Sequence, residues 1–176
     1  MRSWALRIAY VLALAAATHW LALWLLPQVI MHQLIERLGQ EIGLNRPARP
    51  PLPDHTSRRV VMPSPDLLYV ICAFDLAKGP LTVEAVPQSE AARLPYWSVA
   101  FYADNSDNFF VLNDREAGAR PIRLMLTDGP VAAPEGARAV VSPTRRGVVL
   151  FRVLVADGEN REAAEAARRG MSCRPA

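Results

Sequence analysis

The chain has 176 residues, of which 51% are hydrophobic, and 20 basic side chains stand against 17 acidic ones. This length supports one domain with a core and a short appendage. The excess of positive charge lies in residues 1–53, and the remainder carries equal numbers of basic and acidic residues. The main domain therefore lacks the basic face on which nucleic-acid binding depends, and we expect no nucleic-acid partner.

The segment Ile8–Leu26 contains no formally charged side chain. As a helix it would be about 28 Å long at ~1.5 Å per residue, which matches the hydrocarbon core of a lipid bilayer. A cleavable signal peptide is the alternative, because Arg2 and Arg7 form a basic start and Ala15–Ala17 resembles a cleavage site. The apolar run continues well beyond these alanines, which favours an uncleaved anchor.

The basic end before this span predicts an amino terminus in the cytoplasm, because basic flanks of membrane helices stay inside. We expect residues 1–27 to anchor the chain in the bilayer and the remainder to be exported. In a Gram-negative organism the chain would then be a single-pass inner-membrane protein with a periplasmic main domain.

Residues 28–53 are expected to connect the anchor to the domain. Apolar side chains four positions apart predict an amphipathic helix over Gln28–Leu44, with Pro27 in its first turn. This helix could continue the anchor, lie on the membrane surface or pack against the domain. The next segment, Asn45–Pro53, has four prolines, which predict an extended, stiff spacer that holds the domain away from the bilayer.

Residues 54–176 alternate short β-type runs with turn signals, which predicts one all-β domain, a mainly antiparallel sandwich. The last run is the most apolar and is expected at the centre of a sheet, with Arg152 at an edge or paired. A helix is predicted over Glu159–Arg169; its apolar face is only alanine, so we expect it to lie loosely on the domain. The seven predicted strands are Leu67–Phe74, Leu81–Val86, Tyr96–Tyr102, Phe109–Leu112, Ile122–Leu126, Ala139–Val141 and Val148–Val155.

The residues most typical of a binding site flank the turn Asp104–Asn108, which joins two of these strands as a predicted β-hairpin. Aromatic, amide and charged side chains near this hairpin would line a polar-aromatic pocket for a small molecule. The alternative assigns the same side chains to the core, to the outer face of a sheet and to a turn. The candidate ligand-binding residues are Tyr96, Trp97, Tyr102, Asn108, Asn113, Asp114 and Arg115.

The same turn does not fit an EF-hand calcium loop that starts at Asp104. Phe109 stands where that loop needs glycine, and Arg115 stands where it needs glutamate. A looser calcium site built from Asp104, Asp107 and Asp114 stays open.

The histidines His19, His32 and His55 all precede the predicted strands. The sequence has no hydrolase, phosphate-binding or dinucleotide-binding motif. We therefore predict no catalytic residue, no metal site and no cofactor. Cys72 and Cys173 are the two cysteines. In an oxidising compartment they could form a disulfide that closes a loop of about 100 residues, or Cys72 could be a small core residue.

Three blocks of sequence carry a family resemblance. They are SPDLLY at Ser64–Tyr69, YWS at Tyr96–Ser98 together with Asp107–Arg115, and SPTRRG at Ser142–Gly147. Together they resemble the bacterial family known as domain of unknown function 1254 over Ser64–Val155. The resemblance implies a β-sandwich of jelly-roll type and no known activity. It also implies a companion, because this domain often adjoins a second domain of unknown function, 1214, which here would be a separately encoded protein.

The expected function follows from these points. We predict a membrane-anchored, non-catalytic module that binds a companion protein outside the cytoplasm. The alternative is a small-molecule binder or hydrolase that uses a pocket at the hairpin of residues 96–115.

Overall fold

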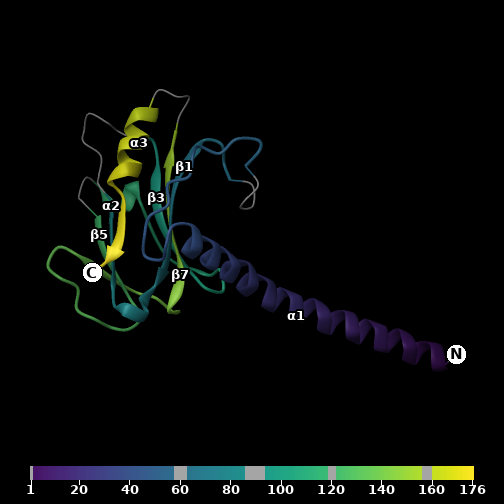
Figure 1. Ribbon diagram of the computed structural model, residues 1–176. Coiled ribbons are helices and arrows are strands. Elements are labelled where there is room, and N and C mark those ends of the chain that lie inside the picture. Colours follow the sequence, from purple (N-terminus) through teal and green to yellow (C-terminus); the bar gives the residue numbers. More distant parts are fainter. Residues whose placement is uncertain (1, 58–62, 86–93, 119–121, 156–159) are drawn as a thin grey trace.

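The structure is a computed structural model that describes residues 2–57, 63–85, 94–118, 122–155 and 160–176. A β domain carries one long helix that projects away from it (Figure 1). The helices are α1 (Arg2–Glu41), α2 (Asp114–Ala117) and α3 (Arg161–Gly170), with a 3-10 turn, η1, at Leu76–Lys78. The strands are β1 (Leu67–Asp75), β2 (Leu81–Ala85), β3 (Trp97–Ala103), β4 (Asn108–Asn113), β5 (Ile122–Thr127), β6 (Arg138–Val141), β7 (Arg146–Leu154) and β8 (Ser172–Pro175).

The strands form two four-stranded sheets. Sheet A has the order β1-β7-β3-β4, and sheet B has the order β6-β5-β2-β8. Only the β5–β6 pair among them is parallel. Phe74 and Phe101 of sheet A share one core with Leu81 and Leu124 of sheet B, so the two sheets are packed face to face. The prediction of a mainly antiparallel β domain is confirmed.

All seven predicted strands occur, and sequence analysis missed an eighth. Strand β8 has the sequence SCRP, which shows neither alternation nor β-branched residues. It is a strand because its backbone pairs with β2, from Leu81 opposite Pro175 to Glu84 opposite Ser172. Long-range pairing of this kind overrides local propensity.

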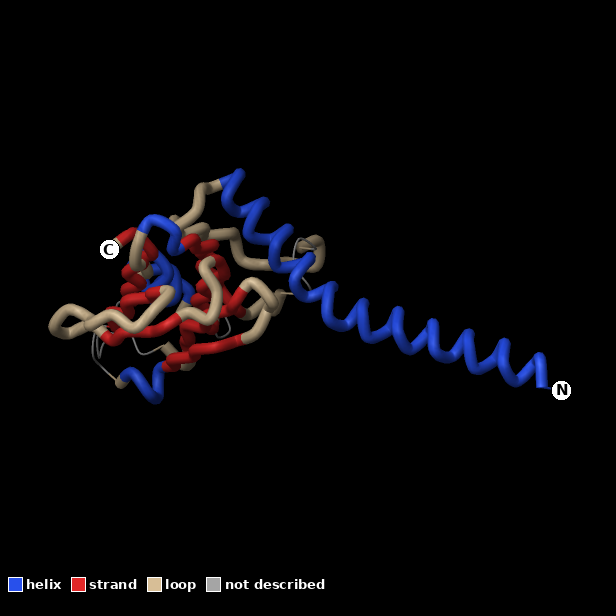
Figure 2. Tube along the Cα trace, turned by 90° about the horizontal axis from the view of Figure 1, so that it is seen from below, coloured by secondary structure: helices blue, strands red, loops and turns tan. Residues whose placement is uncertain are grey.

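Helix α1 is one continuous helix. It runs from Arg2 to Glu41 with Pro27 inside it, so the segment predicted as an amphipathic helix over Gln28–Leu44 continues the apolar span, which is one of the arrangements that the sequence left open. Proline removes one hydrogen bond from a helix. Two side chains bind carbonyl groups in this part of the helix: Gln28 Nε2 donates to the Trp24 carbonyl at 3.2 Å, and Ser106 Oγ donates to the Pro27 carbonyl at 3.1 Å. The helix continues through the proline (Figure 2).

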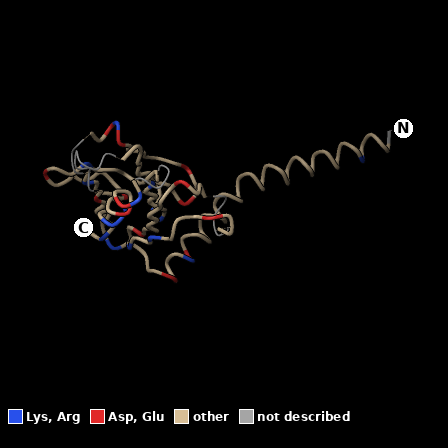
Figure 3. Tube along the Cα trace, turned by 90° about the horizontal axis from the view of Figure 1, so that it is seen from above, with Lys and Arg blue, Asp and Glu red and all other residues tan. Residues whose placement is uncertain are grey.

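The apolar part of α1 lies away from the β domain. Trp20 is 71% exposed and Leu23 is 53% exposed, and charged residues are concentrated in the β domain and the last turns of the helix (Figure 3). Within the described residues this one helix is long and apolar enough to cross a membrane.

The last turns of α1 dock on sheet A. Met31 and Ile35 are buried against Ala73 of β1 and Val148 of β7. At the same end of the sheet, Arg146 Nη2 lies 2.7 Å from a carboxylate oxygen of Glu36 in α1. Of the three arrangements that the sequence left open, the helix thus shows two: it continues the apolar segment and it packs against the domain.

The proline-rich segment is extended but is not a spacer. Asn45 exchanges two hydrogen bonds of 2.9 Å with the backbone of Asp75 through its side chain, and Ala48 forms an antiparallel bridge with Ile71 of β1. The segment therefore covers the edge of sheet A instead of separating the domain from the helix.

At the end of the proline-rich segment, hydrogen bonds from Thr56 lower the pKa of the exposed Asp54 carboxyl.

Helix α3 is held firmly, contrary to the expectation of a loose contact. Ala164 is fully buried in the core between the sheets, because a small side chain allows the helix backbone to approach closely. The carboxyl end of α3 is bound by Arg49, whose Nε donates to the Arg168 carbonyl at 3.2 Å and whose Nη2 donates to the carbonyls of Arg169 at 3.3 Å and Met171 at 2.7 Å. A cation at this end also complements the helix dipole.

Replacing Arg49 by alanine is expected to destabilise α3 and β8 by about 1 kcal/mol, since three charge-assisted hydrogen bonds to the helix end are lost. Hydrogen exchange followed by mass spectrometry should show faster exchange in Arg161–Pro175. Arg46→Ala, a change at an exposed arginine of the same segment, is the control and should leave this exchange unchanged. Equal exchange in both variants would contradict the role of Arg49.

A disulfide closes one side of the sandwich. Cys72 of β1 is joined to Cys173 of β8, with the two Cα atoms 6.6 Å apart and 101 positions apart in sequence. The bond links sheet A to sheet B, and Cys173 is buried, with 2% of its surface exposed. Because α3 and the segment after α1 also lie at this edge, we call it the closed side.

The opposite side of the sandwich, formed by the edge strands β4 and β6, is called the open side here. Across it the guanidinium of Arg138 in β6 lies 5.1 Å from the centre of the Phe110 ring in β4. Val111 of β4 is 43% exposed and Val141 of β6 is 50% exposed. Edge strands also present backbone groups that are free to pair with another chain.

Candidate functional site

The outer face of sheet A, which points away from the core, carries three rows of side chains. Paired residues in neighbouring strands share a face, and residues two apart along a strand return to it. The row nearest the end of α1 contains Ala73, Val148 and Tyr102; the middle row contains Ile71, Leu150, Ala100 and Val111; the third contains Tyr69, Arg152, Ser98 and Asn113. This face therefore changes from apolar to polar with distance from α1.

An apolar cavity of about 260 Å³, the outer groove, lies between α1 and the first two rows. It is somewhat smaller than the ~300–1,000 Å³ of sites for drug-sized ligands, so it suits a narrow apolar group. Ser106, one of its lining residues, also binds the Pro27 carbonyl. The groove therefore lies next to the part of α1 that directly follows the apolar span Ile8–Leu26. The lining residues are Met31, Leu34, Ile71, Tyr102, Ser106, Val148 and Leu150.

Arg152 lies in the centre of the third row. We predicted that this residue lies at a sheet edge or is paired. Its strand, β7, is an interior strand of sheet A, so the residue is not at an edge. Its Nε atom is buried and has no hydrogen-bond partner among the described residues, and no ion pair of Arg152 with a described carboxylate is found either. The prediction of a paired arginine is therefore not met within the described part of the chain.

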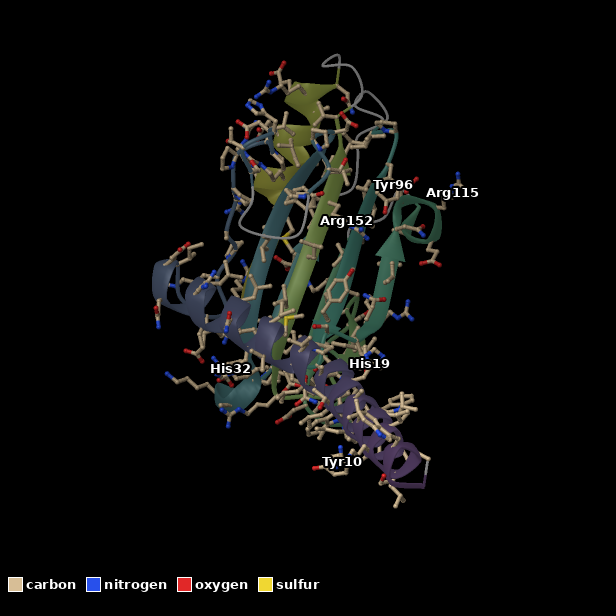
Figure 4. All side chains as sticks on the ribbon, turned by 90° about the vertical axis from the view of Figure 1, so that its right-hand side faces the viewer. Tyr10, His19, His32, Tyr96, Arg115 and Arg152 are labelled. Carbon is tan, nitrogen blue, oxygen red and sulfur yellow. A yellow bond between two sulfur atoms is a disulfide. The ribbon has the colours of Figure 1, made fainter. Side chains whose placement is uncertain are left out.

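The strand neighbours of Arg152 carry hydroxyl groups. Tyr69 and Ser98 are its partners in the neighbouring strands. The Tyr96 hydroxyl donates to Ser98 Oγ at 2.8 Å, and the Tyr69 hydroxyl accepts from the Ser64 amide at 3.0 Å. Figure 4 shows Arg152 on the sheet with Tyr96 near it. A cation among hydroxyl groups is suited to binding an anionic group.

The aromatic residues of the predicted site are divided between two faces. Trp97 is 4% exposed and its ring centre lies 6.0 Å from that of Phe151, so it belongs to the core. Tyr102 lines the outer groove, and Tyr96 binds Ser98 in the third row. Tyr96 and Tyr102 thus share the outer face of sheet A, and Trp97 does not.

The polar residues of the predicted site serve local structure. Asn113 Oδ1 accepts hydrogen bonds of 3.0 Å from the amides of Arg115 and Glu116, which caps α2. Asn108 Nδ2 donates to the Phe101 carbonyl at 3.2 Å. Asp114 lies in α2 itself, and Arg115 is exposed and projects away from the sheet (Figure 4). The seven candidate residues therefore do not converge on one described pocket.

The predicted hairpin turn is present and is stabilised by hydrogen bonds between its own residues. The Ala103 amide donates to the Asp107 carbonyl at 2.9 Å, and Asn105 Nδ2 donates to Asp107 Oδ2 at 2.7 Å. In the described ranges no three His, Cys, Asp or Glu side chains lie close enough together to hold a metal ion. The looser calcium site from Asp104, Asp107 and Asp114 is thus not assembled here.

Sequence reasoning missed the outer groove and the position of Arg152. The available signal was an arginine that breaks the apolar alternation of the most hydrophobic strand. The groove itself could not be found, since its lining comes from α1, β1, β3, β7 and the β3–β4 turn.

The comparisons with known proteins identify a family and a fold. A family model described as Protein of unknown function (DUF1254) matches residues 44–175. Among solved structures, the chain is similar to the VPA0106 protein of Vibrio parahaemolyticus, with a TM-score of 0.67 and 15% identity over 88% of this chain and 36% of that one. A putative uncharacterized protein from Burkholderia cenocepacia gives a TM-score of 0.48 and 14% identity over 65% of this chain and 32% of that one.

This chain spans about a third of the length of each of these two proteins, and no curated protein matches it. The likeness to the Vibrio protein supports the fold alone. The family model extends the resemblance noted from Ser64–Val155 to residues 44–175, so it includes the proline-rich segment, α3 and β8. Since it covers most of the chain, the protein belongs to the DUF1254 family of proteins of unknown function.

Proposed function

We propose that this chain is a single-pass inner-membrane protein whose periplasmic β domain binds a companion protein and catalyses no reaction itself. The observation that carries the proposal is that α1 has two parts, an exposed apolar part and a last part that packs on the β domain. Its apolar part is exposed and long enough for a bilayer, and Met31 and Ile35 of its last turns are buried against sheet A. One continuous helix would hold the domain next to the membrane surface in a fixed orientation.

Charge and redox chemistry support export of the domain. Arg2 and Arg7 precede the apolar segment, and basic flanks stay in the cytoplasm. The disulfide between Cys72 and Cys173 is typical of proteins that fold in an oxidising compartment such as the periplasm.

The open side is the surface that supports a companion. The closed side is occupied by the disulfide, α3 and the segment after α1, whereas β4 and β6 end the two sheets with exposed Val111 and Val141. A partner that adds a strand to such an edge gains main-chain hydrogen bonds and covers apolar side chains. We propose a companion of the type known as domain of unknown function 1214, and, as part of the same proposal, that the sandwich is of the jelly-roll class.

Copurification from membranes tests the companion. Tagged full-length protein should bring down a protein of the 1214 type identified by mass spectrometry. Val141→Arg and Ala139→Arg on β6 should reduce its recovery about tenfold or more, because a charge is placed at the centre of the proposed contact. Ala77→Arg, at an exposed position on η1, is the matched control and should bind normally. Absence of such a protein from the wild-type sample would refute the proposed partner.

A further inference from the structure

We infer that the outer face of sheet A binds an anionic single-chain lipid, with the hydrocarbon chain in the outer groove and the charged head group on Arg152. The inference goes beyond the proposed function, but it rests on the proposed anchor in one respect, which is that the bilayer supplies the lipid.

The groove has the chemistry of a site for a hydrocarbon chain. Of its seven lining residues, four are aliphatic and one is methionine, with Tyr102 and Ser106 as the others. Ser106 is already bound to the Pro27 carbonyl at 3.1 Å. The groove therefore offers apolar surface and few polar groups that need a partner, which favours an apolar occupant.

The groove and the cation lie on one line. Val148, Leu150 and Arg152 alternate on the outer face of β7, with about 7 Å between successive side chains. Val148 and Leu150 line the groove, and Arg152 follows directly. A molecule that fills the groove and continues along β7 therefore places its next group at the guanidinium.

The head group must be anionic because of what surrounds Arg152. Its Nε atom is buried without a hydrogen-bond partner among the described residues, and its strand neighbours Tyr69, which is half-buried, and Ser98, which is buried beneath the Tyr96 hydroxyl, carry no carboxylate. A carboxylate or phosphate would satisfy the guanidinium and accept further hydrogen bonds from hydroxyl groups.

The position of the groove indicates where the lipid comes from. Ser106 lines the groove and binds the carbonyl of Pro27, the residue that directly follows the proposed membrane span Ile8–Leu26. The groove therefore lies at the end of that span. A lipid that leaves the outer leaflet with its head group first would arrive with that group toward Arg152 and its chain beside α1.

Photocrosslinking tests this assignment. The full-length protein is placed in nanodiscs of neutral phospholipid that contain a long-chain fatty acid with a photoreactive group in its chain, and the labelled peptides are mapped. We expect label in Leu67–Asp75 and Arg146–Leu154. Leu150→Glu should reduce this label about tenfold or more, because it places a charge in the groove. Val131→Glu, at an exposed valine between β5 and β6, is the matched control and should keep it.

A second pair of probes tests the head group. Arg152→Gln should lower labelling by the fatty acid about tenfold, the effect of removing a hydrogen-bonded charge, and should leave labelling by the corresponding fatty alcohol unchanged. Resistance of the disulfide-bonded form to proteolysis shows that each variant is folded.

The outcomes separate the inference from the proposed anchor. Label confined to Ile8–Leu26 in every variant, or equal losses in Leu150→Glu and Val131→Glu, would overturn the groove. Equal effects of Arg152→Gln on both probes would overturn the assignment of the head group. Labelling of the groove by fatty acid added from solution, with none from the nanodisc, would support the binding site and overturn its supply from the bilayer.

Discussion

Replacing Cys72 and Cys173 by alanine together is expected to lower the free energy of unfolding by about 4 kcal/mol. The bond closes a loop of 101 residues, and in the chain-entropy model a loop of this length restricts the unfolded chain by ~4.7 kcal/mol. It is also the covalent link between β1 of sheet A and β8 of sheet B. In the double variant the unfolded chain is no longer restricted by this link, so unfolding becomes more favourable.

Urea unfolding of the detergent-solubilised protein, followed by tryptophan fluorescence, measures this effect. The oxidised wild type should unfold at a much higher urea concentration than the double variant, and reduced wild type should resemble the variant. The variant itself should not respond to reductant. Coincident transitions for oxidised and reduced wild type would contradict a stabilising role for the disulfide.

Gly147→Ala is expected to destabilise the domain by about 3 kcal/mol or more. Gly147 lies in β7, opposite Phe74 of β1 and Ala103 of β3. A methyl group on its Cα would overlap the Tyr102 carbonyl oxygen and would lie 2.5 Å from Phe74 Cζ. Backbone cannot move aside at an interior strand, and Phe74 is fully buried, so the added atom would force β7 away from β1 and β3.

Gly129→Ala is the matched control, because an added Cβ at Gly129 meets no atom within 4 Å. Thermal unfolding of both variants should show a large fall in the midpoint for Gly147→Ala and a change close to zero for Gly129→Ala. Similar midpoints for the two variants would show that sheet A can adjust at this position and would contradict the close packing described here.

The parts of the fold that the sequence predicts are those with local signals. Short β-type runs between turn residues indicated strands β1 to β7, and Asp104–Asn108 indicated the β3–β4 turn. The apolar span was evident for the same reason, because nineteen consecutive residues without a formal charge need no tertiary context.

The parts that it could not predict depend on contacts between distant segments. Pro27 reads as a helix start, yet α1 continues through it and its last turns dock on sheet A. Asn45–Pro53 was predicted to be a spacer, but Ala48 pairs with Ile71 and Arg49 binds the end of α3. The outer groove needs the register of β1, β7 and β3 as well as the position of α1, and neither has a local signal.

The central claim is that α1 anchors the chain with its β domain outside the cytoplasm. Fusion of alkaline phosphatase after Ala176 tests it most directly, because this enzyme is active only where its own disulfides can form. We expect high phosphatase activity in the membrane fraction. A reporter that fluoresces only in the cytoplasm should give no fluorescence when it is fused at the same position. An inactive phosphatase together with a fluorescent cytoplasmic reporter would contradict it.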